Sequence, residues 1–260
     1  MELTRTLNFV EKLMVRVGNY IYQLSSRRKK IYYKGAVDLV TQFDRLSQRM
    51  IIEVLKEKFP DYGILSEENY VQKSNNSARW ILDPLDGTTN FAHNLPIWSI
   101  SLALEMEDKI LLGLVYDPTR KELFTAIKGR GAYLNGKRIR VSQTKSLGKS
   151  LLVTGFPYDI RKTKENNLNY FAKFCIYAQA VRRLGSAALD LCYTACGRFD
   201  GYWELKLSPW DQAAGYLILK EAGGKITDFK GKPFNIYDKE ILGTNGFIHS
   251  QMLKILNKND

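Results

Sequence analysis

The sequence predicts a mixed α/β protein made of two halves that meet near residue 148. In several segments apolar residues recur every three or four positions, which is the period of an amphipathic helix. From residue 96 to 141, short segments of alternating apolar and polar residues are separated by turn signals, as in an antiparallel meander. Beyond residue 148, strand-like and helix-like segments alternate. We therefore predict an N-terminal α+β half over residues 1–148 and a C-terminal α/β half over residues 149–260.

The N-terminal half begins with helical patterns. An apolar stripe predicts a helix over residues 1–25, and a second helix over 43–58 is stopped by Pro60, because proline cannot continue a helix. Asn135-Gly136 marks a tight hairpin turn at the end of the meander. The expected strands of this half are residues 38–40, 62–66, 79–82, 97–104, 110–116 and 122–127.

The C-terminal half alternates strands and helices without any internal repeat or low-complexity linker. Gly223-Gly224 is a C-terminal helix stop. The expected strands are residues 150–154, 180–183, 201–204, 225–228 and 241–243, and the expected helices are residues 163–177, 186–196, 211–222 and 247–257.

The composition excludes several classes of protein. Among 260 residues there are only two histidines and three cysteines, and the cysteines show no Cys-x-x-Cys spacing, so we expect neither a zinc ribbon nor a dithiol redox centre. The longest apolar stretch, residues 110–116, is far too short to span a bilayer, and the N-terminus lacks the apolar core of a signal peptide. We expect a cytoplasmic protein without membrane association. Cys192 and Cys196 are expected to be small apolar packing residues.

Charge is distributed unevenly along the chain. The formal net charge is +12, but the segments 1–60, 61–120, 121–180 and 181–260 carry +6, −5, +9 and +2. The basic flanks are compatible with a nucleic-acid-associated protein. The interleaved aromatic and basic residues of an RNA-reading module are not evident, so we do not favour this alternative.

The acidic segment contains an unusual construction. An apolar strand ends at Asp83, a proline-led turn follows, and Asp86-Gly87-Thr88 opens a helix. Unpaired N–H groups at a helix start bind phosphate oxygens well. Clustered carboxylates repel one another unless a cation or a shared proton compensates, and their oxygens are ligands that Mg²⁺ prefers. This segment therefore indicates a metal site beside an anion cradle.

A simpler interpretation is an Asp-Gly turn in which Asp86 caps a helix. A second strand-to-helix junction favours the metal site over this simpler interpretation. In the other half of the chain, Glu204 ends a strand and Asp211 opens a helix. Asp211 by itself is equally compatible with a helix N-cap.

Taken together, these segments resemble the inositol monophosphatase family of magnesium-dependent, lithium-sensitive phosphatases. The resemblance implies a layered αβαβα sandwich. The matching blocks occur in the family's order and at about its spacings, and they are Asp38-Leu39-Val40-Thr41 with Asp44, Glu67-Glu68, the segment from Asp83 to Asn90, Gly185-Ser186-Ala187-Ala188, Glu204, and Trp210-Asp211-Gln212-Ala213-Ala214-Gly215.

The resemblance implies two to three Mg²⁺ ions. Glu67, Asp83 and the carbonyl of Leu85 would hold the first ion, and a third, weaker ion would bind near Glu67. Asp83 would bridge to the second ion, which Asp86 and Asp211 would also hold.

The catalytic residues implied by the resemblance are Thr88, Asp44 and Glu67. Thr88 and Asp44 would form a relay that, with the metal, activates the attacking water. The N–H groups of Gly87 and Thr88 would hold the phosphate. The stretch around Lys34, Gly35 and Ala36 would close over the metals.

The alcohol portion of the substrate would contact Glu204 and the turn formed by Gly185, Ser186 and Ala187. For the pair Arg182 and Arg183 we favour a contact with a partner subunit over a contact with substrate phosphate.

The activity implied is inositol-1-monophosphatase, which converts a myo-inositol phosphate and water into inositol and phosphate, in a homodimer. The alternative is a fructose-1,6-bisphosphatase or a dual enzyme for both substrates. NADP and 3′-phosphoadenosine phosphates are less favoured substrates. A glycosidase with paired carboxylates would need no metal, and Gly129-Arg130-Gly131 completes neither a Walker loop nor a Rossmann fingerprint.

Overall fold

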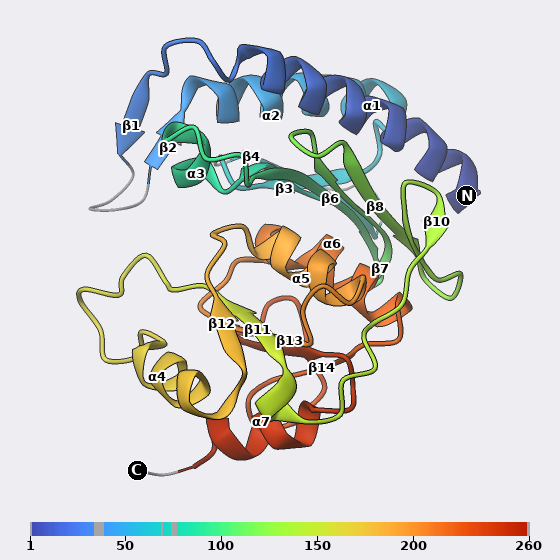
Figure 1. The fold of residues 1–260 in the computed structure, drawn as a ribbon. Helices are drawn as coiled ribbons and strands as arrows, with labels where there is room; N and C mark the ends of the chain where they lie inside the picture. Colours follow the sequence, from blue (N-terminus) through green and yellow to red (C-terminus); the bar gives the residue numbers. More distant parts are fainter. Residues whose placement is uncertain (1, 34–38, 69, 74–76, 259–260) are drawn as a thin grey trace.

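The computed structural model describes residues 2–33, 39–68, 70–73 and 77–258. Five layers follow one another in Figure 1. Helices α1 (Leu3–Leu24) and α2 (Gln42–Lys58) cover the outer face of an eight-stranded sheet. Helices α5 (Ala187–Ala195) and α6 (Pro209–Glu221) lie between this sheet and a five-stranded one. Helices α4 (Leu168–Tyr177) and α7 (His249–Leu256) form the last layer. The predicted αβαβα sandwich is confirmed.

The eight-stranded sheet has the order β10-β9-β8-β7-β6-β5-β3-β4. Its neighbouring strands are antiparallel, as predicted for the meander, except that β3 and β5 run parallel. Strand β4 was not predicted, and it is only three residues long. The strands are β3 (Gly63–Ser66), β4 (Tyr70–Gln72), β5 (Ala78–Asp86), β6 (Ser99–Met106), β7 (Lys109–Asp117), β8 (Glu122–Ile127), β9 (Ala132–Leu134) and β10 (Lys137–Arg138).

A separate two-stranded sheet pairs β1 (Ile31–Tyr33) with β2 (Leu39–Thr41), and β2 leads directly into α2. The stretch expected to close over the site, Lys34 to Ala36, lies outside the described residues, as does Asp38. A short helix, α3 (Thr88–Ala92), follows β5.

The five-stranded sheet has the order β12-β11-β13-β15-β14 and mixes parallel and antiparallel neighbours. Helix α4 begins at residue 168, not at 163, because Asn167 has a left-handed backbone and its side chain is bonded to Thr154 and Gly155. The strands are β11 (Leu151–Thr154), β12 (Ala180–Arg182), β13 (Gly201–Leu205), β14 (Lys225–Thr227) and β15 (Glu240–Thr244), and a 3₁₀ turn, η1 (Leu147–Lys149), precedes them.

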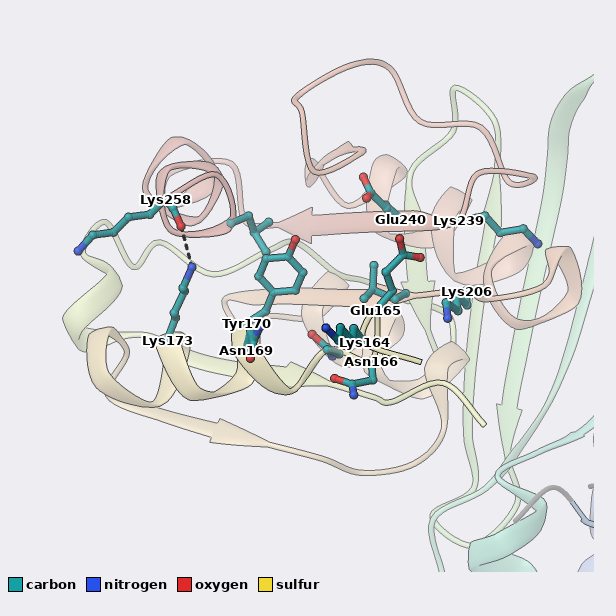
Figure 2. Close-up of a pocket in the computed structure, with 13 residues that line it drawn as sticks. Lys164, Glu165, Asn166, Asn169, Tyr170, Lys173, Lys206, Lys239, Glu240 and Lys258 are labelled. Carbon is teal, nitrogen blue, oxygen red and sulfur yellow. Dashed lines mark hydrogen bonds between the residues drawn. The ribbon is translucent and has the colours of Figure 1, made fainter. Parts of the chain in front are cut away.

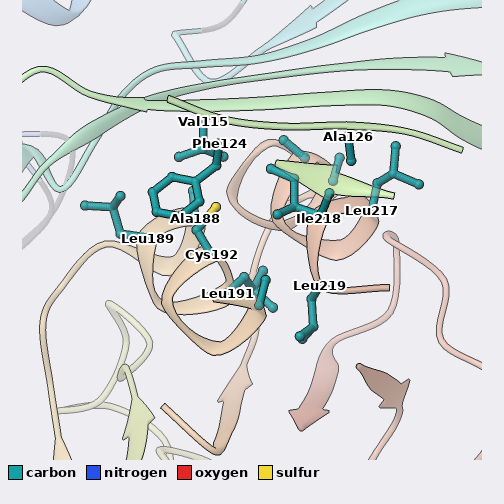
Figure 3. Packing of buried hydrophobic residues seen from close by; sticks show 14 of the residues in the cluster. Val115, Phe124, Ala126, Ala188, Leu189, Leu191, Cys192, Leu217, Ile218 and Leu219 are labelled. Atoms are coloured by element: carbon teal, nitrogen blue, oxygen red, sulfur yellow. The ribbon is translucent and has the colours of Figure 1, made fainter. Parts of the chain in front are cut away.

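The central core joins the two halves of the chain. Val115 and Phe124 from the eight-stranded sheet pack against Leu189 of α5 and Ile218 of α6, as Figure 3 shows. Cys192 is fully buried in this cluster, which confirms its predicted role as a packing residue. The strands of the two large sheets lie on either side of residue 148, and the division into halves 1–148 and 149–260 stays a prediction.

None of the helices in the described ranges is both long enough and apolar enough to cross a bilayer.

Candidate active site

A cleft of about 270 Å³ opens where the end of β5 meets the first turns of α3, α5 and α6. Eleven of the twelve predicted site residues line it, and they are Glu67, Asp83, Leu85, Asp86, Gly87, Thr88, Gly185, Ser186, Ala187, Glu204 and Asp211. The twelfth, Asp44, is completely buried behind Thr88. The structure therefore brings both halves of the predicted constellation to one place.

A β-bulge sets the direction of the two central carboxylates. Residues three apart on a regular strand point to opposite faces of the sheet. Between Asp83 and Asp86, β5 has two residues opposite one residue of β6, so the extra residue turns both carboxylates into the same cleft. We predicted a proline-led turn here; instead the strand runs through Pro84 to Asp86. The bulge is stabilised by Leu85 N–H, which donates to Asp83 Oδ1 at 2.9 Å.

Thr88 and Asp44 form a buried hydrogen-bonded pair. The Thr88 hydroxyl lies 2.7 Å from Asp44 Oδ1 and 2.9 Å from the Leu85 carbonyl oxygen, so it can donate its proton to either acceptor. Asp44 also belongs to the capping box of α2, where its other oxygen accepts bonds from the backbone N–H and hydroxyl of Thr41. Burial raises the pKa of Asp44 to about 6 although these hydrogen bonds oppose the rise.

Gly87 allows two loops to approach each other closely. Its φ of +95° is left-handed, and an added Cβ would lie 3.0 Å from the Ile97 carbonyl oxygen and 3.2 Å from that of Gly185. Asn90 in α3 holds the same contact, because its Nδ2 donates to the Ile97 and Leu184 carbonyls at 2.8 Å. The start of α3 therefore lies directly against the turn that precedes α5.

Asp86 connects the two halves through the first turn of α5. Its Oδ2 accepts hydrogen bonds from the Ser186 hydroxyl at 2.5 Å and the Ala188 N–H at 2.9 Å. Ser186 is the N-cap of α5, and its hydroxyl accepts from Leu189 N–H. We expected the Ser186 turn to contact the alcohol portion of the substrate; within the protein the hydroxyl of Ser186 is bonded to Asp86.

The second half supplies Asp211 and Glu204. Asp211 lies in the first turn of α6, whose N-cap is Ser208, and Ser208 N–H donates to Asp211 Oδ2 at 2.6 Å. Glu204 Oε2 accepts a hydrogen bond from the Tyr202 hydroxyl at 2.7 Å. Burial raises the pKa of Glu204 to about 7, while the Tyr202 hydrogen bond and the charge of Arg183 oppose the rise. Its carboxylate fills the space beside Gly155, where any Cβ would collide with it.

The acidic end of the cleft has the chemistry of a metal site. Burial, together with repulsion from Glu67, Asp86 and Asp211, raises the pKa of Asp83 well above its ordinary value. Desolvation and repulsion from Glu67 likewise raise the pKa of Asp211. A cation would remove this repulsion, and donor sets made only of oxygen suit hard divalent ions.

The carboxylates of the described residues do not form a complete metal-ligand set as they stand. Among the described residues, no three His, Cys, Asp or Glu side chains are arranged to hold a metal ion as they stand. The hydrogen bonds described above go to Oδ1 of Asp83 and to Oδ2 of Asp86 and Asp211, so the second oxygen of each carboxylate is the candidate metal ligand. The residues therefore fit a metal that binds through these second oxygens.

A larger cavity of about 460 Å³ lies on the other side of Leu205 and Lys206, which line both spaces. Figure 2 shows Tyr170 in its middle, and the side chains of Lys239 and Lys258 reach away from it. The carboxylates among its lining residues are Glu165 and Glu240. It therefore lacks the cluster of four carboxylates that marks the smaller cleft.

The model of the inositol monophosphatase family matches residues 2–260. The chain belongs to the inositol monophosphatase family. An inositol-1-monophosphatase from Synechocystis sp. is 44% identical over 257 residues, covering 98% of this chain and 90% of that protein. A fructose-1,6-bisphosphatase/inositol-1-monophosphatase from Thermotoga maritima is 39% identical over 253 residues, covering 97% and 96% of the two chains.

Solved structures agree with this family membership. The inositol monophosphatase from Anabaena (Nostoc) sp. superimposes with a TM-score of 0.90 at 40% identity, covering 98% of this chain and 96% of that one. Inositol monophosphatase family proteins are generally metal-dependent phosphatases, and the chain is accordingly a phosphoric monoester hydrolase.

Several residues of the cleft were not among the predicted site residues. They include Asp190, Arg183 and Tyr158. Arg183 lines the cleft, and the subunit contact that we favoured for Arg182 and Arg183 stays a prediction. Asp190 follows Ser186 by four residues, and a helix that starts at Ser186 places residue 190 on the same face. That spacing was the available signal, and it was overlooked because Asp190 belongs to no matching motif.

Proposed function

We propose that this protein is a Mg²⁺-dependent phosphatase whose substrate is a polyol monophosphate, with inositol 1-phosphate first among them. The observation that carries the proposal is the meeting of Glu67, Asp83, Asp86 and Asp211 in one cleft with the first turns of α3 and α5. The name of the Synechocystis relative supports this substrate.

The acidic residues divide into overlapping ligand sets. Glu67, Asp83 and the Leu85 carbonyl would hold one Mg²⁺, and Asp83, Asp86 and Asp211 would hold a second, with a third near Glu67. Bound Mg²⁺ supplies charge neutralisation and lowers the pKa of a coordinated water. Asp83 is central because it is the most deeply buried of these carboxylates, at 1% exposure, and it is repelled by the other three.

Proton transfer is assigned to Thr88 and Asp44, with Glu67 beside the attacking water. Thr88 Oγ1 passes its proton to Asp44 Oδ1 over 2.7 Å and can then accept a proton from that water at the same oxygen. The N–H groups of Gly87 and Thr88 hold the phosphate, because both residues line the cleft at the start of α3. Glu204 and the turn of Gly185, Ser186 and Ala187 contact the alcohol portion of the substrate.

Fructose 1,6-bisphosphate is the second candidate substrate. Arg183 and Lys206 place two cationic side chains in the lining of the cleft, where a second phosphate needs them. Lys206 is already bonded to Asp159 at 2.8 Å and Thr163 at 2.9 Å, and Glu204 repels a phosphate near it, so we favour the monophosphate.

The test is phosphate release from a panel of phosphate monoesters, with Mg²⁺ and again with chelator. We expect activity only with Mg²⁺, inhibition by Li⁺, and preference for inositol 1-phosphate over fructose 1,6-bisphosphate. Asp83→Asn should abolish turnover and weaken Mg²⁺ binding in calorimetry, because two ions share this charge. Asp228→Asn, outside the cleft, is the matched control. Normal turnover by Asp83→Asn at saturating Mg²⁺ would refute the ligand assignment.

We also propose that the protein is a homodimer in the cytoplasm, as the family resemblance implies. Light scattering behind size-exclusion chromatography should give about twice the chain mass of 29.9 kDa. A single-chain mass at micromolar concentration would contradict the dimer.

A further inference from the structure

Asp190 is a buried carboxylate in the wall of the cleft without a hydrogen-bond partner. The residue is 1% exposed, and neither of its carboxylate oxygens has a partner among the described residues. Most buried polar groups in folded proteins are hydrogen-bonded, so each exception needs a reason, such as a ligand or an ordered water. Asp200 shows the usual arrangement, because its two oxygens accept from the Ser142 hydroxyl at 2.5 Å and Leu151 N–H at 2.8 Å.

The surroundings of Asp190 place it at the end of the cleft where the alcohol portion of the substrate is proposed to bind. Glu204 and Asp86 repel its charge, and Arg183 attracts it. The guanidinium of Arg183 lies over Gly185, where an added Cβ would meet Nη1 at 2.6 Å. Burial, with repulsion from the two acids, raises the pKa of Asp190 well above its ordinary value.

Helix α5 links this end of the cleft to the metal end. Its first turn gives the Ser186 hydroxyl and Ala188 N–H to Asp86, and the next residue on the same helix face is Asp190. A ligand whose phosphate lies near the start of α3 therefore extends toward Glu204 and Asp190. Glu204 Oε2 already accepts a hydrogen bond from the Tyr202 hydroxyl, which uses part of its capacity to accept bonds from a substrate. A second carboxylate nearby adds acceptors for further substrate hydroxyls.

We propose that Asp190 is a specificity-determining residue for the alcohol portion of the substrate. Its carboxylate accepts a hydrogen bond from a substrate hydroxyl, directly or through one water held in the cleft. This hydroxyl is the neighbour of the one that donates a hydrogen bond to Glu204. This inference rests on the proposed function and narrows it to polyol monophosphates that carry at least two neighbouring hydroxyl groups. Arg183 balances part of the charge of the two carboxylates.

The protein tolerates an unpartnered carboxylate at a cost to stability, because burying a polar group without a hydrogen bond is unfavourable. Residues retained at such a cost are typical of functional sites. Replacing Asp190 by the nearly isosteric, uncharged asparagine should therefore leave the melting temperature unchanged or raise it. The same substitution at the fully bonded Asp200 should lower it.

The experiment compares steady-state kinetics of Asp190→Asn and wild type on inositol 1-phosphate and on an aryl phosphate without hydroxyls. We expect kcat/KM for inositol 1-phosphate to fall at least about tenfold, as for loss of a hydrogen bond to a charged group. The aryl phosphate should change by less than about twofold. Inhibition of aryl phosphate hydrolysis by free inositol, which reports binding alone, should weaken by the same factor as kcat/KM.

Asp200→Asn is the matched control, because it removes a buried carboxylate outside the cleft and should leave the ratio of the two substrates unchanged. Equal losses on both substrates, or no loss on either, would overturn the assignment of Asp190. If Asp190→Asn does not fold, Asp190→Ser tests the same point.

A failure of the proposed function gives a different result. In that case wild type itself does not release phosphate from inositol 1-phosphate. The Asp190 comparison then uses the best polyol phosphate of the panel against the aryl phosphate.

Discussion

Replacing Ser186 by alanine tests how the two halves of the chain share the cleft. The Ser186 hydroxyl is completely enclosed and donates to Asp86 Oδ2 at 2.5 Å while accepting from Leu189 N–H at 3.4 Å. Alanine removes both bonds at once. Asp86 then keeps the Ala188 N–H at 2.9 Å and the more distant Ser99 hydroxyl at 3.4 Å as donors, and α5 loses its N-cap.

The expected loss of stability follows from these two bonds. A hydrogen bond to a charged group contributes about 1.5–3 kcal/mol, and a serine N-cap contributes about 1 kcal/mol. The 3.4 Å cap bond is long, so we expect its share to be small and the total loss to be about 2–3 kcal/mol. The loss should be largest without Mg²⁺, because a cation near Asp86 would compensate its charge.

The assay is urea unfolding at pH 7, with chelator and with saturating Mg²⁺. We expect a lower midpoint with an unchanged m-value in chelator, a smaller loss with Mg²⁺, and weaker Mg²⁺ binding by calorimetry. Ser186→Thr, which retains a hydroxyl, is the matched control. Wild-type stability and Mg²⁺ affinity in Ser186→Ala would refute the idea that this hydroxyl orients Asp86.

Two further predictions concern Glu204 and His249. Glu204→Gln keeps an acceptor for the Tyr202 hydroxyl but removes the charge. The value of kcat/KM should therefore fall by roughly 10–100-fold for inositol 1-phosphate and by much less for aryl phosphates. Equal losses on both substrates would mean that Glu204 supports the metal end of the cleft. His249 is buried between the hydroxyls of Thr227 and Thr244, and burial, with Lys225 adding, lowers its pKa to about 4. The unfolded chain takes up this proton near pH 6.5, and the folded chain takes it up only near pH 4. The free energy of unfolding should therefore decrease as pH falls from 6.5 to 4, by at most about 3 kcal/mol. Urea unfolding of His249→Gln should show a smaller decrease over the same window, and an unchanged decrease would assign it to other groups.

The elements of this fold were largely predictable because their signals are local. The apolar stripe of α1, Pro60 after α2 and the Asn135-Gly136 turn each determine the backbone within a few residues. What could not be read locally was the pairing of strands. The parallel pairing of β3 with β5 has no local signature, because β4 lies between these two strands in the chain and pairs with β3 on its other side.

The bulge in β5 was missed for a related reason. Pro84 indicates a break in a strand, and a turn is the simplest break. The strand continues because β6 pairs on both sides of the bulge, and Ser47 donates to the Pro84 carbonyl from α2 at 2.7 Å. The prediction that Asp83 and Asp86 lie together was right, although the geometry that places them together was wrong.

The predicted site residues came from motifs, and Asp190 shows what motifs omit. Asp190 lies in the first turn of an otherwise apolar helix, and its spacing from Ser186 is the one local signal that the sequence offers. Its importance depends on which side chains surround it in space, and here Glu204 comes from β13 and Arg183 from the turn before α5. Only the assembled cleft shows that Asp190 lacks a partner among the described residues.

The sequence left open whether Asp86 and Asp211 cap helices or bind a metal, and their hydrogen bonds answer this question. One oxygen of each of Asp44, Asp86 and Asp211 accepts a hydrogen bond from a backbone N–H at or just before the first turn of a helix. These helices are α2, α5 and α6 respectively. Such N–H groups stabilise negative charge and satisfy one side of each carboxylate. Asp86 and Asp211 also line the cleft, and the opposite oxygen of Asp44 accepts from the Thr88 hydroxyl. Asp44 and Asp211 are therefore capping-box acids and site residues at once. The prediction that Asp86 caps the following helix was wrong, because the N-cap of α3 is Gly87 and Asp86 instead bonds to the first turn of α5. All three contacts hold a repelling set of acids in place before any cation binds.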